Sequence, residues 1–115
     1  MTTYRGNSYG FDVWVQDSVG GPGFEMKPEC RKLRPRLDLF NHSPTGFAWG
    51  YGGSGPAQLA LALLADVLGD DELAIAYHQD FKFRVIGRLK QNEHWVLTEE
   101  QILAEFAGLE EARPK

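Results

Sequence analysis

The sequence predicts an α+β fold, with a small antiparallel sheet from the N-terminal half packed against two or three helices from the C-terminal half. Three observations support this prediction. The first half holds short apolar segments separated by turns rich in glycine and proline. The second half holds longer segments with helical composition and spacing. The length of 115 residues, with 43% hydrophobic residues, is typical of a single domain spanning residues 1–115.

Four short segments of the first half are expected to be extended. Residues 11–15 alternate apolar and polar side chains, which is the spacing of a strand with one buried face. Residues 4–6 are expected to form its partner strand across a tight turn. Residues 33–39 carry leucines on a two-residue period, and residues 47–49 are apolar and are expected to form the last strand before a glycine-rich loop.

Two segments are expected to lie outside regular structure. Residues 19–32 are predicted to be a loop insertion, because the run Gly-Gly-Pro-Gly at residues 20–23 does not fit a helix or a strand. Residues 110–115 are predicted to be a frayed tail.

The strongest helix signal covers residues 57–68, which are rich in alanine and leucine. Gln58 and Asp66 are its only polar side chains, so this helix is expected to be buried on most sides. Gly69 is expected to end it.

A second helix is expected to begin at residues 70–72, where acidic side chains favour a helix N-terminus. Its apolar residues recur every four positions from Leu73 to Leu89, which predicts one buried stripe. The charged residues on its other side, expected to face solvent, are Asp80, Lys82, Arg84 and Arg88, with Asp80 and Arg84 at the spacing of an ion pair.

A short strand at residues 94–97 is expected to precede the third helix. Thr98 and Gln101 have the spacing of a capping box, which predicts the start of this helix. Gly108 is expected to end it.

The most informative segment is residues 50–55, Gly-Tyr-Gly-Gly-Ser-Gly, which Pro56 follows directly. Glycine is needed where φ is positive or where another group approaches the backbone closely. Because Ser-Gly-Pro favours an abrupt helix start, we expect a strained turn that begins the central helix. A β-branched residue at Gly53 or Gly55 is then expected to destabilise the fold through its φ angle.

This loop is also a candidate binding site for a small molecule or an anionic nucleotide, since backbone N–H groups at a helix start bind anions. The candidate ligand-binding residues are His42, Ser43, Trp49, Tyr51, Gly52, Gly53, Ser54 and Gly55. The alternative is that the glycines only allow the turn to pack under Trp49, Tyr51 and the helix.

The loop matches the dinucleotide motif G-x-G-x-x-G, but the rest of that motif is missing. The chain is short for a dinucleotide fold, and a second helix is expected after the first where a strand would be needed. A phosphate-binding P-loop is excluded because no Lys-Ser or Lys-Thr follows the glycines.

No catalytic residue, metal site or cofactor is predicted. Asp38, His42, Ser43 and Ser54 could be drawn together as a hydrolase site, but no motif fixes their geometry, and Ser54 lacks the nucleophile elbow. The histidines at positions 42, 78 and 94 have no metal-ligand spacing.

The chain is expected to be cytoplasmic and to make no contact with a membrane. It has one cysteine, Cys30, which fits a reducing compartment. The start of the sequence is polar and does not resemble a secretory signal. The longest apolar tract, residues 59–65, is shorter than the roughly 20 residues that span a bilayer.

A basic cluster in the first half is a candidate surface for nucleic acid or for an acidic partner. Its members are Lys27, Arg31, Lys32, Arg34 and Arg36. Residues 1–36 carry six basic and four acidic side chains, whereas the rest carry six and twelve, and the net charge is -4. This balance argues against extended nucleic-acid binding but leaves a local patch open. Alternatively, the cluster is a solvated strand edge.

Tyr9 and Trp14 can be interpreted in two ways. They could be exposed aromatic residues of an interaction surface, or they could belong to a second small core on the far side of the sheet.

The run Trp-Gly-Tyr-Gly-Gly-Ser-Gly-Pro-Ala-Gln-Leu-Ala at residues 49–60 resembles the DUF6166 family of uncharacterised bacterial and phage proteins. Matching segments are found at residues 4–6, at residues 36–47 and at residues 95–98, so the likeness covers most of the chain. Ala48 departs from the acidic residue expected there. The resemblance implies an accessory role in a phage, plasmid or integrated element, and it implies no mechanism.

Three functions are therefore expected as alternatives. The first is a small non-enzymatic binding protein with a protein partner, such as an accessory or host-defence-countering factor of a mobile element. The second is binding of a small anionic ligand at the loop of residues 50–55. The third is nucleic-acid binding through the basic cluster. The oligomeric state is left open.

Overall fold

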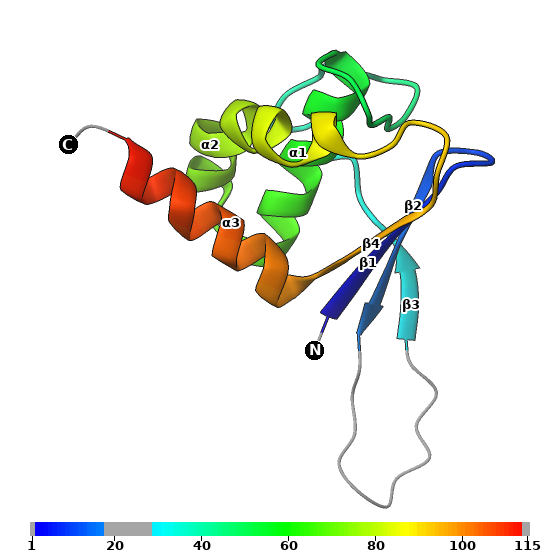
Figure 1. Cartoon of the computed structure of the whole chain (residues 1–115), viewed down its shortest axis with the longest axis horizontal. Coiled ribbons are helices and arrows are strands. Elements are labelled where there is room, and N and C mark those ends of the chain that lie inside the picture. The colour runs from blue at the N-terminus through cyan, green and yellow to red at the C-terminus, as the bar shows by residue number, and fades with distance from the viewer. Residues whose placement is uncertain (1, 18–28, 114–115) are drawn as a thin grey trace, which may run out of the picture.

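The computed structural model describes residues 2–17 and 29–113, and within them the fold is α+β as predicted (Figure 1). The elements in chain order are β1 (Thr2–Asn7), β2 (Asp12–Asp17), β3 (Glu29–Lys32), α1 (Ser54–Leu68), α2 (Asp71–Arg84), the 3-10 helix η1 (Ile86–Arg88), β4 (Trp95–Thr98) and α3 (Glu99–Ala112). None of the described helices is long and apolar enough to cross a membrane.

The four strands form one antiparallel sheet in the order β3-β2-β1-β4. Tyr4 pairs with Val15 on one side and with Leu97 on the other. The inward side chains Tyr4, Val13 and Val15 are buried, and their neighbours along the strands are more exposed. The predicted pairing of residues 4–6 with residues 11–15 and the predicted strand near residues 94–97 are confirmed.

The predicted strand at residues 33–39 is wrong, because the third strand lies earlier, at Glu29–Lys32. These four residues fall inside the segment that was predicted to be a loop, whose remaining residues 19–28 lie outside the described part. Leu33 still continues the pairing, since its backbone N–H donates to Val13 O at 2.9 Å. The chain then turns away at Arg36, which has a φ of 57°.

Residues 47–49 do not form the predicted strand either. They lie between Gly46 and Gly50, both of which have positive φ, and so short a segment cannot also join a sheet. Trp49 is fully buried and meets Trp95 edge to face, with 5.6 Å between the ring centroids. This segment therefore contributes to the core and not to the sheet.

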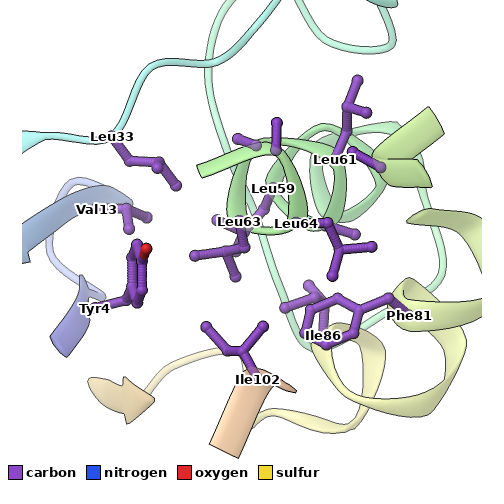
Figure 2. Packing of buried hydrophobic residues seen from close by; sticks show 14 of the residues in the cluster. Tyr4, Val13, Leu33, Leu59, Leu61, Leu63, Leu64, Phe81, Ile86 and Ile102 are labelled. Carbon is purple, nitrogen blue, oxygen red and sulfur yellow. The ribbon is translucent and has the colours of Figure 1, made fainter. Parts of the chain in front are cut away.

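Helix α1 is the centre of the molecule, as its composition predicted. Eleven of its residues are buried, and Gly69 ends it with a left-handed φ of 63°. Figure 2 shows Leu63 pointing toward Tyr4 of the sheet, while Leu64 lies on the side of Ile86. Each fully buried leucine stabilises the fold by roughly 1.5–3 kcal/mol relative to an exposed one.

Helix α2 and the residues that follow it bury most of the predicted stripe, since Phe81 is buried and Tyr77, Val85 and Leu89 pack against the core. The prediction fails at Leu73, which is exposed. The buried side chains of the helix are Ala74, His78, Phe81 and Lys82. The small Ala74 side chain allows α2 to approach α1 closely, and this contact fixes which face is covered.

Two predictions for the charged side of α2 are also wrong. Lys82 is 7% exposed, and its ammonium group lies 4.2 Å from the centroid of the Phe83 ring. Asp80 and Arg84 do not form the predicted ion pair with each other. Arg84 donates to Glu105 of α3, and Asp80 accepts from Arg113, the residue that follows α3.

Helix α3 begins with the predicted capping box, in which Thr98 and Gln101 exchange hydrogen bonds of 2.9 and 3.1 Å. It does not end at Gly108 but continues to Ala112, so residues 110–112 of the predicted tail are helical. A Cβ at Gly108 would lie 2.8 Å from Arg84 Nη2, so this glycine makes room for the Arg84 guanidinium group.

Candidate functional site

The glycines of residues 50–55 shape a closely packed turn. Gly50 has a φ of 85°, its N–H donates to Ile86 O at 3.0 Å, and a Cβ there would lie 2.7 Å from the Gln91 backbone. Gly53 has a φ of -121° and Gly55 is helical, so the prediction that these two glycines need positive φ is wrong. They are needed for close approach instead.

The neighbours of Gly53 and Gly55 leave no room for a Cβ at either position. A Cβ at Gly53 would collide with the Tyr51 ring, and a Cβ at Gly55 would lie 2.7 Å from Ala48 Cβ. Gly53 is the N-cap of α1 without any side-chain cap bond, and Ala57 N–H bonds back to Gly53 O. This geometry supports the interpretation in which the glycines allow a closely packed turn from which α1 begins.

The other candidates for the loop site divide into two groups. Trp49 is in the core, and Tyr51 and Ser54 are exposed at the start of α1, with Gly52 packed near Phe83. His42 and Ser43 lie elsewhere, on a turn held by the buried side chain of Gln58. The structure therefore does not gather these residues around one cavity.

Gln58 fastens residues 35–43 to α1. Its Oε1 atom accepts from His42 N at 2.8 Å and from Ser43 N at 3.1 Å, and its Nε2 atom donates to Pro35 O. Gln58 carries the only side-chain amide of the apolar helix α1, and this amide satisfies three backbone groups of the segment of residues 35–43.

His42 and His78, which the sequence separates by 36 positions, meet with their Nε2 atoms 2.9 Å apart. His78 Nδ1 lies 2.7 Å from Ile75 O and must donate to it, so His78 Nε2 accepts from His42. Phe40 stacks on His42 at 4.1 Å. Burial, with His78 and Lys82 nearby, lowers the pKa of His42. The spacing of His42 and His78 in the sequence does not predict that they meet.

Asp38, His42 and Ser43, three of the residues considered as a hydrolase site, do not bond one another but form hydrogen bonds with other partners. Arg36 donates two hydrogen bonds to Asp38 and lowers the pKa of that carboxyl group, which keeps it ionised. Ser43 Oγ donates to Gly46 O at 2.7 Å. No group of three or more potential metal-ligating side chains occurs within residues 2–17 and 29–113.

Two members of the basic cluster, Arg31 and Arg36, are paired with carboxylates. Arg31 donates to Asp66 at 3.0 Å, and Asp66 also accepts from Tyr4 OH at 2.5 Å. Burial and Asp66 raise the pKa of Tyr4, so its hydroxyl remains a donor. Arg36 bonds Asp71 at 2.9 Å as well as Asp38.

These pairs reduce the positive potential of the hollow of about 310 Å³ that Arg31, Arg34 and Arg36 line beside α1. Lys27 lies outside the described residues. Nucleic-acid binding at this cluster stays a prediction.

The sheet has one face without a covering layer. All three helices lie on the same side of it (Figure 1), and no element within residues 2–17 and 29–113 packs on the other side. We call this other side the open face. The register places Thr3, Arg5, Trp14, Gln16, Cys30, Lys32, Val96 and Thr98 on it.

The centre of the open face is a row that crosses all four strands. Trp14 pairs with Arg5 on β1 and with Lys32 on β3, and Arg5 pairs with Val96 on β4. Trp14 is 38% exposed and Val96 is 50% exposed. The Lys32 ammonium group lies 5.5 Å from the centroid of the Trp14 ring, which is a cation–π contact.

A mostly apolar hollow of about 460 Å³ lies along this row, lined by Arg5, Gly6, Asn7, Trp14, Cys30, His94, Trp95 and Val96. Beyond it the β1–β2 turn carries Tyr9, which is 90% exposed. His94 holds this turn, since its Nδ1 atom accepts from Ser8 N at 3.0 Å and its ring meets Tyr9 edge to face.

These positions answer the question about Tyr9 and Trp14: both are exposed, and no second core covers them among the residues that the structure describes. Tyr9 and Trp14 could be recognised in the sequence as candidates for an interaction surface. Arg5 and Val96 could not, because only strand pairing brings them beside Trp14.

The sequence matches the family described as "Family of unknown function (DUF6166)" over residues 19–108, and the chain therefore belongs to the DUF6166 family. No curated protein and no solved structure shows a significant match.

Proposed function

We propose that this member of the DUF6166 family is a non-enzymatic binding protein that contacts a protein partner through the open face of its sheet. One observation carries the proposal: Trp14 faces outward at the centre of the sheet, between Arg5 and Lys32 and beside an apolar hollow. Tryptophan, tyrosine and arginine are the residues that most often dominate binding energy at protein interfaces.

A partner would gain most by covering Trp14 and Val96. An aromatic side chain offers up to about 250 Å² of surface, so hiding the exposed part of Trp14 would contribute on the order of 2 kcal/mol. Tyr9 extends the same surface at the turn, and its exposure favours a role as an anchor.

The non-enzymatic part of the proposal rests on how the catalytic candidates are used. Asp38, His42 and Ser43 each bond a structural neighbour, and no two of them bond one another. A role in a phage or other mobile element, including one that counters host defence, is proposed from the family resemblance. The genes that neighbour this one would test that part.

Cys30 allows a direct test of the open face. It is the only cysteine of the chain, and it is exposed. A photoreactive benzophenone attached to Cys30 is expected to cross-link one protein reproducibly from a host extract. Trp14→Ala should reduce the yield about tenfold, because a central aromatic anchor contributes 1.4 kcal/mol or more.

The matched control is Leu103→Ala, which removes a side chain of similar exposure on α3 and should leave the yield unchanged. A second control moves the probe to α3 in the double variant Cys30→Ser, Leu103→Cys. Equal cross-linking from that position, or full cross-linking by Trp14→Ala, would refute the proposed surface.

A further inference from the structure

Building on the binding role proposed above, we infer that the open face binds an acidic protein segment, in which a bulky apolar side chain lies between two carboxylates. The first support is the shape and chemistry of the hollow. Trp14 and Val96 are exposed, and they line the hollow together with Gly6 and Trp95. An apolar side chain of the partner fits this lining better than a polar one.

The second support is the charge of the row. Arg5 and Lys32 flank Trp14 from both sides, and neither forms an ion pair with a carboxylate among the described side chains. By contrast, Arg31 and Arg36 are already bonded to aspartates. Within the open face, Arg5 and Lys32 are therefore the cations that can meet charge from outside, in a chain whose net charge is -4.

The third support is the spacing of the two cations. Arg5 and Lys32 lie on strands that are two apart in the sheet. Neighbouring strands are about 4.8 Å apart, so their backbones are about 10 Å apart. An extended peptide advances about 3.3 Å per residue, and its side chains alternate between two faces, so carboxylates four positions apart share one face at about 13 Å. The long side chains of Arg5 and Lys32 can reach this span, and the side chain midway between the two carboxylates would face the apolar hollow beside Trp14.

Single-stranded nucleic acid is the competing occupant, and the charges favour it less. A nucleic-acid strand needs a series of cations along its backbone as well as an aromatic platform. Among the described residues, the open face offers only two cations in its central row, which is fewer than the series that a strand of phosphates would need.

Disulfide exchange at Cys30 would measure this preference, since it brings a weakly binding probe to the hollow at high effective concentration. The probes are three peptides, Glu-Ser-Phe-Leu-Glu, Gln-Ser-Phe-Leu-Gln and Lys-Ser-Phe-Leu-Lys, each joined by the same Gly-Ser linker to a sulfur that forms a mixed disulfide with the buffer thiol. The thiolate of Cys30 in the folded chain attacks this disulfide, binds the peptide sulfur and releases the buffer thiol, and mass spectrometry gives the share of each peptide.

The acidic peptide is expected to exceed the glutamine peptide by about threefold to tenfold, the effect of two exposed ion pairs. Arg5→Gln with Lys32→Gln should reduce this ratio to near one, whereas Arg34→Gln, a cation outside the row, should not. Replacing Phe-Leu by Ala-Ala should lower capture of the acidic peptide in the wild-type chain. Equal capture of all three peptides would overturn the inference.

An oligothymidylate competitor separates the two occupants. One outcome is that low concentrations of the oligothymidylate prevent capture of the acidic peptide, with an effect that weakens steeply as the salt concentration rises. In that case nucleic acid would be the occupant, and the inference would fail. A failed peptide preference, together with Trp14-dependent cross-linking of a partner, would reject only the acidic chemistry. Loss of both results would reject the proposed function as well.

Discussion

At the scale of single residues, two kinds of glycine have to be distinguished. Gly50 combines a positive φ with close contact to the backbone of residue 91, whereas Gly46 has a φ of 144° and open space around its Cα. Gly53 and Gly55 have ordinary backbone angles and need only the missing side chain. A glycine-rich motif shows that some constraint exists, but the neighbours that impose it come from distant parts of the chain.

Gly50→Ala is therefore expected to destabilise the fold by about 2–4 kcal/mol, since backbone strain of about 1–3 kcal/mol adds to the collision with Gln91. Gly46→Ala isolates the strain, because nothing lies within 4 Å of its added Cβ, and it should cost less. Urea unfolding of both variants measures the two free energies. Equal costs would show that the contact with Gln91 contributes nothing.

The histidine pair leads to a pH prediction. The pKa of His42 is lowered in the folded protein, so the unfolded chain binds the proton more readily. Stability from this pair is complete above the ordinary histidine pKa of about 6.5 and is lost as the pH falls below it. The groups facing His42 are the His78 ring and the Lys82 ammonium group, and both oppose a second positive charge.

Urea midpoints measured between pH 7.5 and 5 should fall for the wild-type chain and fall less for His42→Asn. His94→Asn, at the β1–β2 turn, keeps the pair and should retain the full decrease. A wild-type midpoint that rises on acidification over this range would show that the pair is stronger when protonated.

At the scale of elements, prediction succeeded where a segment carries its own signal. The composition of α1, the capping box at Thr98 and the alternation of β2 are local, and all three elements lie where the sequence placed them. The stripe of α2 was predicted in part: Phe81 is buried as the spacing indicates, whereas Leu73 is exposed and His78 is buried, because spacing alone does not show how α2 packs against α1. The open face depends on the pairing of four strands from both ends of the chain, and sequence periodicity does not give that pairing.

Gln58 joins α1 to the segment of residues 35–43, and replacing it tests how much its buried hydrogen bonds stabilise the fold. Gln58→Leu keeps the volume but leaves His42 N, Ser43 N and Pro35 O without their partner. We expect a loss of about 2–4 kcal/mol, the cost of leaving buried polar groups unsatisfied. Asp70→Ala, which removes the N-cap bond of α2, should cost about 1 kcal/mol and serves as a comparison. A more stable Gln58→Leu variant would mean that water replaces the amide without cost.

At the scale of the whole molecule, the proposed function places stability and binding on opposite sides of one sheet. The side that faces α1 carries Tyr4, Val13 and Val15 in the core, and the open face carries side chains that no described element covers. Substitutions on the open face should therefore change binding with little effect on folding, a separation that a core residue cannot show.

Trp14→Thr tests this separation, because threonine suits a strand but removes the aromatic surface. Its urea midpoint should stay within about 1 kcal/mol of wild type, while cross-linking from Cys30 is lost. Trp95→Ala, on the opposite side of the sheet, should cost about 3–5 kcal/mol, since its ring packs on Trp49. If Trp14→Thr unfolded the chain as readily as Trp95→Ala, Trp14 would be a structural residue and the open face would not be the binding surface.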